Sequence, residues 1–157
     1  MATPKLQASR AIPVYPTDNA LIPMPANLKI TRTNTSTSAN QLVDTSGLFV
    51  TRGVQVGDVV WNTSGNTYAT VTVVNSETTL TLNANIFAST PLNYQIFGSP
   101  YNNAGCVLYI GTTGNLVVLT AGDDIVTFTA IPAGTFLPVN IKQIYAATTA
   151  SNIVALW

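Results

Sequence analysis

The chain contains no histidine and only one cysteine, Cys106, and these two absences exclude several kinds of site. Without histidine, no Ser-His-Asp or Cys-His catalytic arrangement can form, and the commonest general acid–base group at neutral pH is missing. Zinc sites are built mainly from Cys and His, so we expect no such metal site. A single thiol cannot form an intrachain disulfide, and the apolar run 105–110 predicts that Cys106 is buried.

Charged residues are scarce as well. They make up 8% of the chain, whereas soluble domains typically contain about 25%. Six basic and six acidic residues give a net charge of zero, although freely diffusing proteins usually keep a net charge that helps solubility. A neutral surface rich in Thr, Ser, Asn and Gln favours a protein covered by neighbours in an assembly. A neutral secreted β-domain is the alternative.

Basic residues are too few and too scattered for a nucleic-acid interface, which needs clustered Lys and Arg. Five of the six lie in the first third of the chain, and we interpret them as local contacts for the N-terminal segment: Lys5, Arg10, Lys29, Arg32 and Arg52. No apolar stretch approaches the roughly 20 residues of a membrane helix. The N-terminus also lacks the apolar core of a signal peptide. We therefore expect synthesis in a cytoplasm, and no nucleic-acid or membrane partner.

The six carboxylates offer two weak possibilities for chemistry. Asp58 and Glu77 could face each other as in a glycosidase, and Asp123 with Asp124 could hold calcium in a turn. The simpler interpretation of the second pair is a turn whose side chains cap backbone amides. Nucleotide-binding and EF-hand motifs are missing. We therefore expect no enzyme activity, catalytic residue, cofactor or metal.

Residues 1–27 are predicted to form an extended arm, because five of the nine prolines lie there and proline excludes a helix or a central strand. The arm also carries apolar side chains, which favour packing on its own domain or on a neighbour over a disordered tail. The candidate partner-interface residues are Ile12, Val14, Tyr15, Leu21, Ile22 and Met24.

The rest of the chain has the pattern of short β-strands separated by turn residues. We expect a β-module over 28–98 and a second over 104–157. The polar run 34–40 is predicted to be a loop, and Gly111 and Gly114 a hairpin turn. The predicted strands are 28–31, 58–61, 68–74, 79–82, 94–97, 106–110, 116–119, 125–129, 139–145 and 153–157. The fold class is all-β, with one or two antiparallel sandwich or barrel modules and very little helix.

Four aromatic residues near one predicted turn allow a further alternative. Exposed together, they could stack on sugar rings as in a carbohydrate-binding module. Cross-strand packing is the commoner role of such residues. They are Trp61, Tyr68, Tyr94 and Phe97.

Two stretches resemble small structural proteins of tailed bacteriophages. The first runs from Gly57-Asp58-Val59-Val60-Trp61 through the hairpin 68–82. The second runs from Val107-Leu108-Tyr109-Ile110 through Pro132-Ala133-Gly134-Thr135-Phe136-Leu137-Pro138-Val139 to Ala155-Leu156-Trp157. The resemblance covers residues 48–157. It implies a component of the virion and brings no catalytic residues.

The expected function is a capsid decoration (cement) protein that binds the outside of the major capsid shell and stabilises it. The resemblance implies a homo-oligomer, with a trimer favoured. A tail, baseplate or spike-base component is the first alternative, and a carbohydrate-binding host-attachment module is the second. The expected partners are the major capsid protein or other virion proteins.

Overall fold

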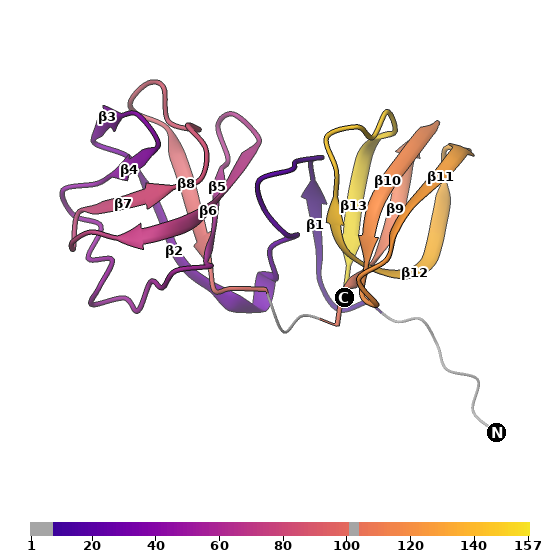
Figure 1. Cartoon of the computed structure of the whole chain (residues 1–157), viewed down its shortest axis with the longest axis horizontal. Coiled ribbons are helices and arrows are strands. Elements are labelled where there is room, and N and C mark those ends of the chain that lie inside the picture. Colours follow the sequence, from indigo (N-terminus) through magenta and orange to yellow (C-terminus); the bar gives the residue numbers. More distant parts are fainter. Residues whose placement is uncertain (1–7, 101–103) are drawn as a thin grey trace. The chain divides into compact units, whose positions relative to one another are not determined.

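The computed structural model describes residues 8–100 and 104–157, and within them the fold is all-β (Figure 1). These described residues form thirteen strands and one short 3-10 helix, η1 (Pro25–Asn27). No α-helix occurs in these described ranges. The all-β prediction is confirmed. In the same part of the chain, no helix is long and apolar enough to cross a membrane.

The chain forms two compact units, each with its own sheet system. Among the described residues, unit 1 combines 8–16 with 104–157, and unit 2 consists of 17–100. The described part of the predicted 1–27 arm is therefore divided, with residues 8–16 in unit 1 and residues 17–27 in unit 2. Residues 1–7 of the arm lie outside the described residues.

Unit 2 is a seven-stranded antiparallel sheet with the order β2-β8-β5-β6-β7-β4-β3. The predicted hairpin 68–82 is present as β6 paired with β7. The strand bounds are β2 (Leu28–Thr33), β3 (Ser36–Ser38), β4 (Gln41–Val43), β5 (Val59–Asn62), β6 (Thr67–Val74), β7 (Thr79–Leu82) and β8 (Asn93–Phe97).

The core of unit 2 follows from strand alternation. In β7, Leu80 and Leu82 are buried while the intervening threonine is half-buried, as expected for a sheet with one covered face. The strand β5, which lies between β8 and β6, is buried along its whole length. Phe49 and Phe87, from segments outside the strands, complete this core.

Unit 1 is a six-stranded antiparallel sheet with the order β1-β13-β9-β12-β10-β11. Its inner side chains alternate with outer ones along β9 and β13, whose buried residues include Leu108, Ile110, Ile153 and Ala155. The strand bounds are β1 (Ala11–Val14), β9 (Cys106–Thr112), β10 (Gly114–Thr120), β11 (Ile125–Ile131), β12 (Thr135–Ile144) and β13 (Ser151–Leu156). The strand β12 contains Pro138, and its pairing with β9 shifts register between Leu137 and Ile141, where the missing amide is tolerated.

The predicted hairpin turn at Gly111 and Gly114 is wrong. β9 and β10 are not neighbours, since both pair antiparallel with β12 and so run in the same direction. Neither glycine has a positive φ. A side chain at Gly111 would lie 2.6 Å from the backbone oxygen of Asn152. These glycines therefore permit close backbone approach rather than a tight turn.

The predicted loop 34–40 is also corrected, because Ser36–Ser38 forms β3 and pairs with β4. Its three residues are all exposed, so no apolar alternation marked it as a strand. The buried side chain of Asn34 connects the start of β3 to the segment before β8. Its amide nitrogen donates to the carbonyls of Ser36 (3.2 Å) and Ser89 (3.0 Å), and its oxygen accepts the Leu92 amide (2.7 Å).

Within the predicted arm, residues 11–14 are extended as predicted but belong to a sheet, whereas Pro25–Asn27 departs from the prediction and forms the 3-10 helix η1. Ala11–Val14 pairs along β13 as the edge strand β1. Arg10 and Trp157 exchange both backbone hydrogen bonds. By the alternation of antiparallel ladders, the amide positions of Ala11 and Pro13 therefore face away from β13. Pro13 thus costs no ladder hydrogen bond, which explains how a proline fits here.

Candidate docking surface

Two buried carboxylates of unit 2, Asp58 and Asp44, hold parts of the fold together. Asp58 is almost fully buried, with 1% of its side chain exposed. Oδ2 accepts Lys29 Nζ at 2.6 Å and the amide of Gln55 at 2.9 Å, and Oδ1 accepts the amide of Ser99 at 2.9 Å. Three hydrogen-bond donors therefore compensate the burial of this carboxylate. Through them, Asp58 connects β2 to the segments that precede β5 and follow β8.

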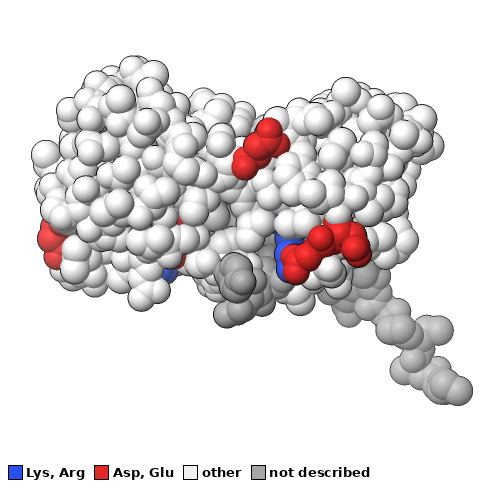
Figure 2. Space-filling view, viewed as in Figure 1, with Lys and Arg blue, Asp and Glu red and all other residues white. Residues whose placement is uncertain are grey.

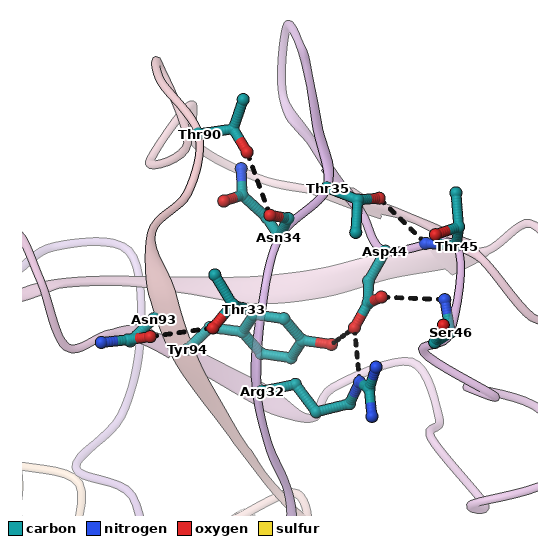
Figure 3. A network of polar contacts seen from close by, with 10 residues as sticks. All are labelled: Arg32, Thr33, Asn34, Thr35, Asp44, Thr45, Ser46, Thr90, Asn93 and Tyr94. Atoms are coloured by element: carbon teal, nitrogen blue, oxygen red, sulfur yellow. Dashed lines mark hydrogen bonds and ion pairs between the residues drawn. The ribbon is translucent and has the colours of Figure 1, made fainter.

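A second buried carboxylate, Asp44, joins three segments of unit 2 (Figure 3). Its Oδ2 accepts Arg32 Nε at 2.7 Å and Tyr94 Oη at 2.8 Å, while Oδ1 accepts the amide of Ser46 at 2.9 Å. Burial opposes ionisation of Asp44, but the hydrogen bonds from Arg32, Ser46 and Tyr94 outweigh it and hold the pKa of Asp44 below its usual value. Burial, together with the hydrogen bond to Asp44, raises the pKa of Tyr94.

Lys29 and Arg32 were interpreted from the sequence as contacts for the N-terminal segment, and this interpretation is wrong. Both side chains instead bind buried carboxylates of unit 2. Because the partner carboxylates are buried and already hydrogen bonded, neither cation belongs to an anion-binding surface.

The weaker catalytic and metal possibilities gain no geometric support. Glu77 accepts the hydroxyl of Thr51 at 2.6 Å and its amide at 3.1 Å, whereas Asp58 is held by Lys29. Asp123 is a turn residue with φ 67°, and its carboxylate binds Lys142 Nζ at 2.8 Å. Within residues 8–100 and 104–157, no three metal-ligating side chains cluster.

Cys106 is buried, as its apolar surroundings predicted. Its side chain is in contact with the carbonyl oxygen of Ile141, with Sγ at 3.4 Å. Burial raises the pKa of the thiol to about 12. Thiolates rather than thiols are nucleophiles, so the thiol of Cys106 is expected to react slowly at neutral pH.

The four aromatic residues considered for sugar binding are packed in the interior. Trp61, Tyr68, Tyr94 and Phe97 are all buried. Trp61 and Tyr68 are cross-strand partners, with ring centroids 5.6 Å apart and an interplanar angle of 28°. The exposed platform that a carbohydrate-binding module requires is therefore not formed by these residues.

The six candidate interface residues are divided between the two units. Val14 and Ile22 are buried, 4% and 5% exposed, and so contribute to the fold instead of a partner surface. Ile12, Tyr15, Leu21 and Met24 are half-buried. Unit 2 holds its part of the segment through the Asn19 carbonyl, which accepts Thr70 Oγ1 and Asn83 Nδ2.

The structure instead reveals an uncharged outer face on unit 1. The register places Pro13 opposite Val154, Val154 opposite Tyr109, and Tyr109 opposite Phe136. Directly opposed residues share a face of a sheet. A second row pairs Leu156 with Val107. We call this set the apolar face: Pro13, Val107, Tyr109, Phe136, Val154 and Leu156.

The apolar face is open to solvent. Pro13 is exposed, Phe136 is 56% exposed, and the other four members are half-buried. The rings of Tyr109 and Phe136 lie 5.1 Å apart at an interplanar angle of 55°, a geometry typical of aromatic pairs. No member carries a charge, so these six side chains give this side of unit 1 an apolar surface.

A hollow of about 320 Å³ lies at one end of this face. Its lining includes Val107, Phe136, Leu156 and Trp157, together with Gly105 and Asn140. In the view of Figure 2, charged atoms form a few small groups and most of the visible surface is uncharged.

These strands were predicted from the sequence without a prediction of which of their apolar side chains point outward, and so the apolar face was missed. A signal was present in β9, where Tyr109 lies between the core residues Leu108 and Ile110 and must point outward. The alternation in 153–156 carries the same signal. The side-by-side order of β1, β13, β9 and β12 depends on pairing between distant segments, so no local pattern predicts it.

Comparisons with known proteins identify no relative. No protein-family model, no curated protein and no solved structure matches the chain.

Proposed function

We propose that this chain is a non-catalytic structural subunit of a phage particle, a decoration (cement) protein that binds the outside of the major capsid shell. The apolar face of unit 1 carries the proposal. It is an uncharged sheet surface that carries the aromatic pair Tyr109 and Phe136 and lines a hollow. The phage-like stretches 57–82 and 107–157 support the same role.

The placement of charged side chains also supports a subunit that functions by binding through its surface. The two carboxylates of unit 2 that are buried, Asp44 and Asp58, are fully engaged by their own unit. The apolar face displays aromatic and aliphatic groups, which are the kinds of side chain that dominate binding at interface centres. A decoration protein that adheres over a broad neutral area needs this chemistry and no catalytic group.

A tail, baseplate or spike-base component is the second candidate. The resemblance of the hairpin 68–82 to modules shared with tail proteins favours it. Both candidates use a docking face, and they differ in the number of copies per particle. In either role, copies of the chain are proposed to form homo-oligomers, with a trimer for the decoration protein.

The direct test is rebinding of purified chain to particles that lack it. We expect Phe136→Asp to reduce the bound amount at least about tenfold, because the variant places an unpaired charge in a contact that excludes water. Thr37→Asp is the matched control, since Thr37 is exposed on β3 of unit 2. Equal binding of Phe136→Asp and wild type would rule out the apolar face, and failure of wild type to bind would contradict the particle role.

A further inference from the structure

The two sheets present four edges, and one of them is chemically unprotected. The edge strands are β1, β11, β2 and β3. Natural proteins protect exposed edges with proline, charged side chains or very short strands, because an open edge readily pairs with another strand. β1 has Pro13, β2 carries Lys29 and Arg32, and β3 is three residues long. β11 contains no proline and no charge.

The free backbone groups of β11 can be assigned from its pairing with β10 (Figure 1). The Thr120 amide donates to the Asp124 carbonyl at 2.9 Å, which makes this opposed pair a hydrogen-bonded one. Antiparallel ladders alternate, so Val126 and Phe128 bond to β10. The amides and carbonyls of Ile125 and Thr127 therefore point away from the sheet.

We propose that β11 pairs antiparallel with β11 of a second copy, so that two copies share a continuous sheet across a two-fold axis at Thr127. The free groups of Thr127 in the two copies then bond to each other. Ile125, which is 67% exposed, lies opposite Thr129 of the other copy, and Val126 lies opposite Phe128. Pairs of β-branched with aromatic residues stabilise neighbouring strands.

Charge favours a second copy as the occupant of this edge. The nearest carboxylates, Asp123 and Asp124, precede β11. In the register centred on Thr127, the regular pairing covers residues 125–129. Asp123 and Asp124 precede this segment, Asp123 in a turn with φ 67°, and the strand departs from regular geometry at Ala130, whose φ is 52°. No carboxylate faces another, and the paired segment 125–129 is uncharged. The irregularity of the β10–β11 ladder lies between Gly114 and Leu116, beyond Phe128 on β11, so the central residues keep regular strand geometry.

This inference does not rest on the particle role, because it concerns the isolated chain in solution. A two-fold contact through β11 is also a different interface from the three-fold association implied by the phage resemblance. It uses none of the residues of the apolar face.

Cross-linking of a cysteine variant tests the register. In Thr127→Cys the two thiols would lie with Cβ atoms about 5 Å apart, within reach of a short bismaleimide. We expect a covalent dimer on a denaturing gel. Thr37→Cys is the matched control, because Thr37 is an exposed threonine on the short edge strand β3, and Cys106 is buried. Dimer formation no greater than that of Thr37→Cys overturns the inference.

Sedimentation of a charge variant provides an independent readout. Thr127→Lys brings two like charges together at the proposed axis, so we expect its self-association to weaken at least about tenfold. Thr37→Lys adds the same charge elsewhere and should associate as wild type does. Far-ultraviolet circular dichroism checks that both variants are folded. Association of Thr127→Lys equal to that of Thr37→Lys overturns the inference.

Discussion

Tyr94 donates its phenolic hydrogen to Oδ2 of Asp44 across 2.8 Å, in the interior of unit 2. The two residues are fifty positions apart in the chain, and the contact joins β8 to the segment after β4. Arg32 of β2 binds the same oxygen. A single carboxylate therefore holds together strands that are distant in sequence.

Replacement of Tyr94 by Phe should destabilise unit 2 by about 1–3 kcal/mol, because a buried charged acceptor loses a donor while the ring is retained. Urea unfolding followed by circular dichroism measures the change. Thr37→Ala, at an exposed position of the same unit, should have little effect. Unchanged stability of Tyr94→Phe would show that the hydroxyl contributes nothing.

The stability of unit 2 should decline in acid. The pKa of Asp44 is lower in the folded chain than its ordinary value, so its ionised form stabilises the fold above the unfolded pKa of about 4. That stabilisation is lost as pH falls through the folded pKa. The hydrogen bonds from Thr51 likewise lower the pKa of Glu77, which acts in the same direction.

The variant Asp44→Asn isolates this contribution. At neutral pH we expect the variant to be less stable than wild type, and the gap should narrow as the solution is acidified, because only wild type loses a charge at residue 44. Urea unfolding at a series of pH values measures the gap. A gap that is constant over the whole range contradicts the linkage.

Deletion of residues 1–16 should destabilise unit 1. The deletion removes β1 and uncovers β13, and the buried side chain of Val14 alone contributes about 1.5–3 kcal/mol. Deletion of residues 1–7 is the control, since it leaves β1 in place. Thermal unfolding that is unchanged by the longer deletion would contradict the assignment of β1 to the sheet.

Cys106 should resist thiol reagents in the native protein. Its pKa of about 12 leaves almost no thiolate at pH 8, and burial blocks access. A chromogenic disulfide reagent should react slowly with the native chain and rapidly in denaturant. The exposed thiol of Thr37→Cys should react at once under native conditions. Rapid reaction of wild type would contradict the burial of Cys106.

The strands were largely predictable, because alternation and turn residues are local properties. The strongly apolar segments 68–74, 79–82 and 106–110 appear as expected in β6, β7 and β9. The polar strand β3 was missed because its exposed Ser and Thr residues carry no apolar period.

The neighbours of each strand were harder to predict. Gly111 and Gly114 are residues typical of turns. In the structure, their lack of a side chain allows the backbones of Asn152 and Ala150 to approach closely. Val14 and Ile22 lie in a proline-rich apolar segment that predicted contact with a partner, yet both side chains are buried within the chain itself. The apolar face depends on the order β1-β13-β9-β12, which arises from pairing between residues far apart in the chain.

The copy number of this chain in purified phage particles tests the proposed role most directly. Quantitative mass spectrometry against the major capsid protein gives the ratio. A decoration protein that covers the shell predicts about one copy per capsid subunit, as expected when each subunit offers an equivalent site. A ratio of a few per cent would contradict decoration and favour a tail component, and absence from the particles would contradict the structural role itself.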